Sequence, residues 1–349
     1  MNDVRPFDVI EADAVDVLAD LGAPLVVAAN EPPWSSVAAR LPSTVNIVAM
    51  TKAWNMDLRY LEQVAANITA TTDPDVLAAA TVVGLGGGTG LDTAKYLAFA
   101  LKLPLVQVPT ITSVDAGFTD AIGVRIDGRV RYIANVRPTN VIIDLPLIRA
   151  APPRLNRAGI GDVLSCHTGL FDWRLAAGHG DGHPLDAQLV ALGEALLVEL
   201  EAAVDEIAGV SEDGVRFLVD AYRRIGAACA SAGHSRFEEG SEHFWAYAYE
   251  HTTGAHLVHG ELIAFAVCAL SHVQGNDADR AFEIVRRSRV RAHPADLGID
   301  HETFAACLTN LAAYSRAEHL DMAVADYEPI TNAMIADAWQ FVNGLPTER

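Results

Sequence analysis

The chain has 349 residues, of which 51% are hydrophobic and 20% charged, and its 45 acidic and 25 basic side chains give a formal net charge of −20. This composition is typical of a globular protein and argues against a disordered, fibrous or disulfide-stapled chain. Because a chain with this net negative charge repels nucleic-acid phosphates and anionic lipid, we expect neither nucleic acid nor a membrane as a partner. At roughly 100–200 residues per domain, the length predicts two domains.

Sorting signals and cysteine pairs indicate the compartment in which a protein resides. Residues 1–22 contain no basic region followed by an apolar stretch, and no apolar run reaches the roughly 20 residues of a membrane span. We therefore expect no signal peptide and a cytoplasmic location. The cysteines are widely spaced without a CxxC pair, which favours buried structural thiols in a reducing compartment. They are Cys166, Cys229, Cys268 and Cys307.

Short apolar runs alternate with helical patterns in the first half of the chain. A hairpin is predicted at 121–134, where Asp127-Gly128 separates two alternating runs. The order of strands and helices predicts a parallel sheet with helices on both faces, which is a Rossmann-like α/β domain. The predicted strands are 23–30, 43–50, 80–87 and 103–110, and the predicted helices are 58–68 and 91–102.

The second half of the chain has a different pattern. From about Ala151 the strand signals end, and long amphipathic helices are predicted at 186–208 and 212–233. Two prolines within 150–159 interrupt one helix and begin the next. We therefore predict an α/β domain in residues 1–150 and an all-α domain in residues 151–349.

A glycine-rich turn, VVGLGGGTGLDTAKYLAF (82–99), follows the third predicted strand, and the next helix is expected to begin near Leu91. Such a turn lets backbone N–H groups approach a pyrophosphate at the start of a helix, where the helix dipole also favours negative charge. The spacing matches neither GxGxxG nor a P-loop, so a tight turn needed only for the fold stays the alternative. The glycines are Gly84, Gly86, Gly87, Gly88 and Gly90.

Four of the twelve histidines lie between positions 243 and 259. Any single histidine is more often a packing or surface residue than a ligand, and a metal site needs at least three converging side chains. His243 and His259 are the better candidates, because neighbouring glycines allow close approach and neighbouring acids can bond the second ring nitrogen. We interpret His251 and His256 as solvated or packing residues.

Asp162 is the candidate for a third ligand. Glycines on either side of Ile160 place its carboxylate at the start of a predicted helix. Considered alone, this aspartate is most simply a helix cap.

Five motifs in a fixed order make the sequence recognisable. Together they resemble the superfamily of iron-containing alcohol dehydrogenases and dehydroquinate synthases, with the glycerol-1-phosphate dehydrogenases and glycerol dehydrogenases as the nearest branches. The resemblance extends from the first strand to His272. The motifs are GGGTGLDTAK (86–95), VPTITSVDA (108–116), RAGIGDVLSCHTGLFDWRLA (157–176), GSEH (240–243) and HGE (259–261).

The resemblance implies a fold of two parts. Residues 1–150 would form a nucleotide-binding domain, and residues 151–349 a helical metal-binding and substrate domain, with a catalytic cleft between them. The implied reaction transfers hydride between a secondary alcohol and the nicotinamide of NAD or NADP, with a metal ion as Lewis acid. The expected partner is a small polyol or ketose, with homo-oligomerisation left open.

The resemblance also implies a role for individual residues. Asp115 falls where the family contacts substrate hydroxyls, and it joins the three metal ligands as a catalytic residue. The ligands would be Asp162, His243 and His259, holding one divalent ion, Zn²⁺ first and Fe²⁺ or Ni²⁺ next. The cofactor would contact Gly87, Gly88 and Thr89 at its pyrophosphate, and Asp92, Thr110, Ser113 and Thr119 elsewhere.

Three positions bear on the substrate and the nucleotide. Tyr247 stands where the glycerol-1-phosphate enzymes commonly have a second histidine, and residues 113–116 read SVDA where those enzymes read SHDG. We therefore expect Tyr247 to face the substrate, and a polyol other than glycerol 1-phosphate to be preferred. The first predicted strand ends in Asn30 rather than in an acid that would bind the ribose 2′-hydroxyl, which leaves both NAD and NADP open.

Two alternatives remain. A sugar-phosphate cyclase of the dehydroquinate synthase type would have glutamate at the position of Asp162 and lysines in its active site. Here the lysines are Lys52, Lys95 and Lys102 only. A non-catalytic binding protein on the same scaffold is the other alternative, which the complete set of ligands disfavours.

Overall fold

The computed structural model describes residues 7–348. Residues 1–6, which belong to the segment where no signal peptide is predicted, lie outside the described residues, as does residue 349. The chain divides into two compact units, Met1–Pro152 and Pro153–Arg349, where the sequence places the division after residue 150. Within residues 7–348, no helix has the length and apolar character needed to cross a membrane.

The first unit is built on a six-stranded parallel sheet in the order β1-β8-β5-β4-β2-β3. The four predicted strands correspond to β2 (Leu25–Ala29), β3 (Ile47–Lys52), β4 (Thr81–Gly86) and β5 (Leu105–Pro109). Two strands were not predicted, because each has only four residues and no long apolar run. These are β1 (Asp8–Glu11) and β8 (Asn140–Ile143).

The predicted hairpin is confirmed. Strands β6 (Ala121–Ile126) and β7 (Arg129–Asn135) pair in antiparallel fashion. Asp127 and Gly128 join them with φ values of 51° and 73°, the left-handed conformation that a tight two-residue hairpin turn requires.

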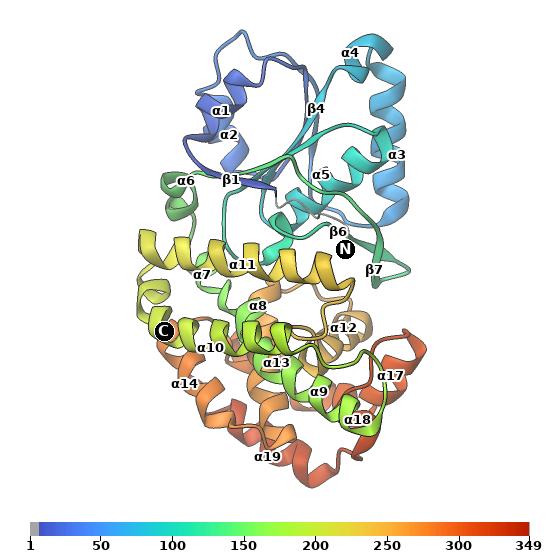
Figure 1. Cartoon of the computed structure of the whole chain (residues 1–349), viewed down its shortest axis with the longest axis vertical. Coiled ribbons are helices and arrows are strands. Elements are labelled where there is room, and N and C mark those ends of the chain that lie inside the picture. The colour runs from blue at the N-terminus through green and yellow to red at the C-terminus, as the bar shows by residue number, and fades with distance from the viewer. Residues whose placement is uncertain (1–6, 349) are drawn as a thin grey trace. The chain divides into compact units, whose positions relative to one another are not determined.

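Helices cover both faces of the parallel sheet, as predicted. Helices α1 (Ala14–Asp20) and α2 (Pro33–Ala38) share an apolar core with one face, and α3 (Leu58–Thr71) and α5 (Gly88–Leu101) share a second core with the other. Figure 1 shows α1 and α2 on one side of β4 and α3 on the other. Two short helices, α4 (Pro74–Ala78) and α6 (Leu145–Ala150), complete the unit.

The described part of the second unit, residues 153–348, contains helices and no strand, as predicted. The two predicted long helices are α10 (Ala187–Gly209) and α11 (Glu212–Ala232). The others are α7 (Pro153–Arg157), α8 (Ile160–Leu164), α9 (Cys166–His179), α12 (Ser241–Thr253), α13 (His259–Gln274), α14 (Ala278–Ser288), α15 (Pro294–Leu297), α16 (His301–Thr309), α17 (Leu311–Ala317), α18 (Val324–Tyr327) and α19 (Asn332–Val342).

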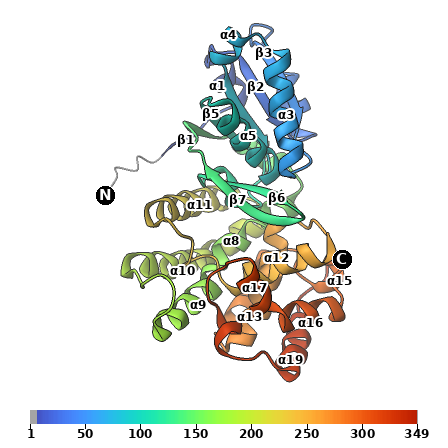
Figure 2. The ribbon, with the colours of Figure 1, turned by 90° about the vertical axis from the view of Figure 1, so that its right-hand side faces the viewer.

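Helix α13 is the centre of this unit. Every residue from Gly260 to Ser271 is buried, which is the pattern of a helix enclosed by protein on all sides. Helices α8, α9, α12, α14 and α19 pack around it. Figure 2 shows α13 near α9, α12 and α19. The first residue of α13 is His259, so the central helix fixes the position of one candidate ligand.

The cysteines lie as structural thiols would. All four are free; Cys166, Cys268 and Cys307 are buried, and Cys229 is partly buried with Sγ 3.0 Å from Glu238 Oε1. Burial raises the pKa of the Cys166 and Cys268 thiols. A protonated, enclosed thiol is a poor nucleophile, so neither cysteine has the properties of a reactive residue.

Candidate functional site

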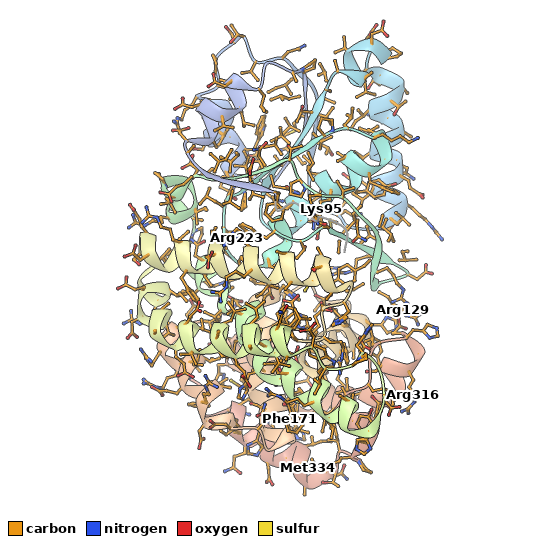
Figure 3. The ribbon with its side chains drawn as sticks, in the orientation of Figure 1. Lys95, Arg129, Phe171, Arg223, Arg316 and Met334 are labelled. Atoms are coloured by element: carbon orange, nitrogen blue, oxygen red, sulfur yellow. The ribbon has the colours of Figure 1, made fainter. Side chains whose placement is uncertain are left out.

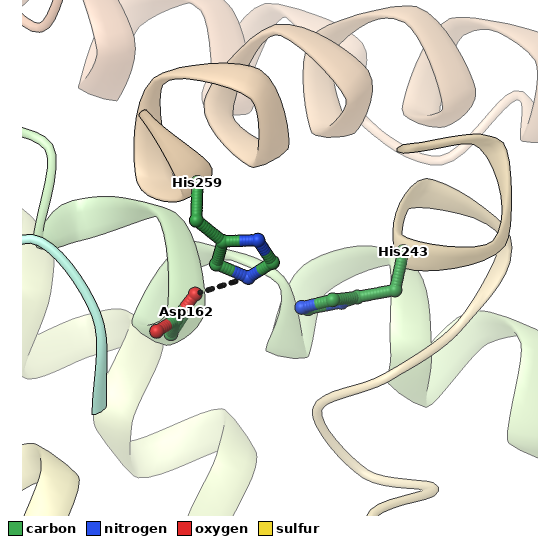
Figure 4. Close-up of side chains that lie close together, drawn as sticks. All are labelled: Asp162, His243 and His259. Carbon is green, nitrogen blue, oxygen red and sulfur yellow. Dashed lines mark ion pairs between the residues drawn. The ribbon is translucent and has the colours of Figure 1, made fainter. Parts of the chain in front are cut away.

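Asp162, His243 and His259 lie together in the second unit. One possible ligand atom from each lies within 4.8 Å of the other two. His259 Nε2 is 3.3 Å from Asp162 Oδ1, and the ring centroids of His243 and His259 are 5.3 Å apart. In Figure 4 both imidazole rings and the carboxylate point toward a common centre. The residues chosen as metal ligands from the sequence are therefore neighbours in the structure.

A close contact between two helices brings two of these side chains together. A Cβ atom on Gly161 would lie 2.6 Å from both the Cα and the carbonyl oxygen of Gly260, so α8 and α13 touch through backbone atoms. Asp162 and His259 adjoin these two glycines in the chain. The N-cap of α8 is Gly159 rather than Asp162, so the aspartate does not serve as the cap that its position in the sequence suggests.

Glu242 orients the ring of His243. Its Oε1 accepts a hydrogen bond from His243 Nδ1 at 2.8 Å and another from the Gly240 backbone N–H at 2.7 Å. Glu242 is completely buried. This arrangement leaves Nε2 as the ring nitrogen available to the cluster, as is usual when a carboxylate supports a metal-binding histidine.

The electrostatics of the cluster favour a cation. Burial has the largest effect on the pKa of His243 and lowers it, but the hydrogen bond with Glu242 and the charges of Glu239, Glu242 and Asp162 together raise it to about 9. The surroundings therefore stabilise positive charge at this position. One carboxylate and two imidazoles are also the donors that Zn²⁺ and Fe²⁺ accept, so the residues present fit a divalent metal ion.

Asp172 is a further residue of this region, which the sequence analysis did not single out. It is buried in α9; Oδ2 accepts from Ser241 N at 2.7 Å and Oδ1 from Val324 N at 2.8 Å. Burial raises its pKa to about 6. Asp172 thus holds the start of α12, the helix that carries His243. An acid within an otherwise apolar stretch of the third motif was the available signal.

Tyr247 lies one helical turn beyond His243 in α12, with the two ring centroids 6.0 Å apart. Its hydroxyl donates to Glu239 Oε1 at 3.2 Å, and 8% of the residue surface is exposed. His251 and His256 are exposed, and neither belongs to the cluster.

The glycine-rich turn joins β4 to α5. This helix begins at Gly88, three residues before the predicted start. The turn is tied to both neighbouring strands: Thr110 N donates to Gly86 O at 2.9 Å, and Gly87 N donates to Asn30 Oδ1 at 3.0 Å. Gly86 alone among the five glycines has a positive φ, 154°. The N–H group of Gly87 is therefore engaged within the protein. The N–H groups of Gly88 and Thr89 belong to the first turn of α5, and such groups have no acceptor within their own helix.

Two predicted cofactor residues meet at a buried lysine. Lys95 of α5, labelled in Figure 3, lies 2.8 Å from Asp92 Oδ1 and 3.4 Å from Thr119 Oγ1. It also donates to Ala121 O at 2.6 Å. Burial raises the pKa of Asp92. The Lys95 ammonium thus joins α5 to the start of β6, a structural role that gives no support to a cyclase active site.

The other predicted residues of the first unit follow β5. Thr110 and Ser113 are buried, and Asp115 begins a short 3₁₀ helix, Asp115–Gly117. The structure therefore places Asp115 in the first unit and the three candidate metal ligands in the second.

Proteins of similar sequence indicate the family to which the chain belongs. Residues 18–152 match the family described as iron-containing alcohol dehydrogenase. A glycerol-1-phosphate dehydrogenase [NAD(P)+] of Hyperthermus butylicus is 31% identical over 261 residues, which cover 74% of this chain and 72% of that protein. The enzyme of the same name from Methanothrix thermoacetophila is 30% identical, over 65% of this chain and 64% of its own length, just under two thirds.

The fold has close counterparts among solved structures. A probable glycerol dehydrogenase from Sinorhizobium meliloti 1021 matches with a TM-score of 0.73 at 21% identity, over 97% of each chain. The order of the sequence motifs, the fold and the similarity to curated relatives lead to the same conclusion. The chain belongs to the iron-containing alcohol dehydrogenase family.

Proposed function

We propose that this NAD(P)-linked alcohol dehydrogenase interconverts the secondary alcohol of a small polyol and the corresponding ketone. The observation that carries the proposal is the cluster of one carboxylate and two imidazoles, Asp162, His243 and His259. When bound there, a divalent metal ion, Zn²⁺ first and Fe²⁺ or Ni²⁺ next, supplies Lewis-acid chemistry to the substrate oxygen.

The remaining roles belong to side chains and backbone groups. Glu242 holds His243 with Nε2 toward the cluster. Gly88 and Thr89, in the first turn of α5, bind the pyrophosphate of the nicotinamide cofactor through backbone N–H groups. Asp115 binds substrate hydroxyls, as the family resemblance implies. With the cofactor bound, the carbinol hydrogen would leave as hydride to the nicotinamide and the hydroxyl proton would pass to solvent, so no protein nucleophile is needed.

The proposal extends to the charge of the substrate. Glu239 Oε1 accepts a hydrogen bond from the Tyr247 hydroxyl, with 3.2 Å between the two oxygens. Glu242 supports His243, which lies in α12 like Tyr247. The carboxylate of Glu239, beside Tyr247, repels a phosphate dianion, whereas it tolerates or binds neutral hydroxyl groups. An uncharged polyol or ketose therefore suits the groups contributed by the second unit better than glycerol 1-phosphate does.

An activity screen tests the function. Dihydroxyacetone, dihydroxyacetone phosphate and larger ketoses are each assayed with NADH and with NADPH, alongside elemental analysis of the purified protein. We expect reduction of an unphosphorylated ketose and roughly one divalent ion per chain. Absence of bound metal together with absence of reductase activity on every ketose would contradict the proposal.

Tyr247→His tests the role of Tyr247 in substrate choice. Histidine restores a group that can donate to a phosphate and carry positive charge. We therefore expect kcat/KM for dihydroxyacetone phosphate to rise relative to that for dihydroxyacetone, by about tenfold or less. Tyr247→Phe is the matched control, since it keeps the ring and removes only the hydroxyl. High wild-type kcat/KM for dihydroxyacetone phosphate, unimproved by the histidine, would show that position 247 does not determine the choice.

Gly88→Val tests the glycine-rich turn. A Cβ atom at position 88 would lie 2.9 Å from Val114 Cγ1, and the branched side chain would occupy the first turn of α5. We expect NADH binding to weaken by about 2 kcal/mol or more, with the metal content unchanged. Fluorescence titration measures the affinity, and Gly209→Val, at an exposed glycine with open space around it, is the control. Unaltered NADH affinity in a folded Gly88→Val protein would show that the turn has only a structural role.

A further inference from the structure

Trp54 has the largest exposed fraction, 70%, among the exposed large hydrophobic side chains of residues 7–348. It lies two residues beyond the end of β3. An indole ring left largely in water is costly for a fold, because tryptophan offers a large apolar surface that burial would stabilise. Loops carry a disproportionate share of ligand-binding residues, so this exposed indole just beyond β3 is a candidate binding position.

A chain of hydrogen bonds connects this loop to the glycine-rich turn. Ala53 N donates to Ala29 O at 2.9 Å, which continues the pairing of β3 with β2. Asn30 Nδ2 then donates to Ala53 O at 2.6 Å, while Asn30 Oδ1 accepts from Gly87 N at 3.0 Å. The single amide of Asn30 therefore spans from the turn to the residue that precedes Trp54.

The strand order indicates which part of a dinucleotide would reach this loop. The connection from β2 leads outward to β3, whereas that from β4 leads to β5 on the other side, so the topology reverses between β2 and β4. Dinucleotides bind at the carboxyl ends of strands at such a point, with the pyrophosphate on the glycine-rich turn and the adenosine ribose over the neighbouring strand. Here that neighbour is β2, and the strand beyond it is β3.

We propose that Trp54 stacks on the adenine ring of the bound nicotinamide dinucleotide. This inference rests on the proposed function, in that it places the pyrophosphate at the turn of β4 and α5. In the dinucleotide, one ribose separates the adenine from the pyrophosphate. With the pyrophosphate on the turn and this ribose over β2, the adenine is directed toward β3. NAD and NADP carry the same adenine, so stacking on its π face would serve both cofactors alike.

Tyr60 holds the indole ring in place. The two ring centroids are 5.3 Å apart with an interplanar angle of 60°, so the rings are in contact without lying flat on each other. Tyr60 belongs to the first turn of α3, which Asp57 caps by accepting from Arg59 N at 3.0 Å. One edge of the loop is thus anchored to a helix while most of the indole surface stays open to a ligand.

Binding measurements on the full chain test the proposal. ADP-ribose carries the adenosine and pyrophosphate, and reduced nicotinamide mononucleotide lacks the adenosine. We expect Trp54→Ala to raise the Kd for ADP-ribose and for NADH about tenfold, as loss of a base-stacking ring does elsewhere, while the Kd for the mononucleotide is unchanged. Trp54→Phe, which keeps an aromatic face, is expected to stay within about threefold of wild type. Calorimetric titration gives these constants without any dependence on turnover.

Phe99→Ala is the matched control, because Phe99 is also an exposed aromatic residue of the first unit but lies near the far end of α5 from the glycine-rich turn. Unchanged ADP-ribose affinity in Trp54→Ala, with wild-type NADH binding intact, would overturn the stacking proposal and leave the proposed function standing. Equal losses in the alanine and phenylalanine variants, or an equal loss of mononucleotide binding, would also overturn it. Wild-type protein that binds neither NADH nor ADP-ribose would overturn both proposals.

Discussion

His243→Ala and His259→Ala are each expected to remove the bound metal and nearly all dehydrogenase turnover. Each imidazole supplies one of three donors that lie within 4.8 Å of one another, and two remaining donors hold a divalent ion weakly. Loss of a residue that only supports a ligand typically costs 10–100-fold in metal affinity, so loss of the ligand itself is expected to cost more than about 100-fold. Metal content after dialysis and kcat measure the effect.

Two other histidines of the same segment provide controls. His251 and His256 are exposed and lie outside the cluster, so their alanine variants are expected to keep metal and activity close to wild type. NADH affinity, measured by titration, is expected to survive all four substitutions, because the proposed pyrophosphate site belongs to the first unit. Equal loss of metal from all four variants would contradict the assignment of His243 and His259 as metal ligands.

That Asp162, His243 and His259 lie together was predictable, because these residues carry their signals locally. Small and acidic neighbours distinguish His243 and His259 from His251 and His256, and the order of motifs adds Asp162. Buried strands such as β2 and β4 were predictable for a related reason, since burial on both faces leaves an uninterrupted apolar run.

The groups that support the site were not predictable in this way. Asp172 accepts hydrogen bonds from backbone N–H groups 69 and 152 residues away in the chain. No local sequence pattern predicts partners at such distances. Lys95 appeared in the sequence only as one of three lysines, although its contacts join α5 to β6. The early start of α5 was missed because its first turn consists of glycine and threonine, and apolar periodicity begins only at Leu91.

The close packing of α8 against α13 is expected to set the spacing of the proposed metal ligands, and Gly161→Ala tests this. A methyl group at position 161 would lie 2.6 Å from the Cα and the carbonyl oxygen of Gly260. Backbone atoms of a buried helix cannot turn aside as a flexible side chain can, so the two helices must separate. We expect the free energy of unfolding to fall by about 1–3 kcal/mol or more, which is the usual effect of overpacking a core.

The same displacement is expected to reach the ligands, since Asp162 and His259 adjoin the two glycines and their facing atoms are 3.3 Å apart. Gly161→Ala should therefore lose metal affinity as well as stability. A substitution that only destabilised the protein would leave the folded molecules with their full metal content. Gly178→Ala, at an exposed glycine of α9 with nothing within 4 Å of the added carbon, is the control, and alanine there is expected to be neutral or slightly stabilising. Urea unfolding and metal content per folded chain measure the two effects. If Gly161→Ala matched the control in both, the contact between α8 and α13 would not set the spacing of the ligands.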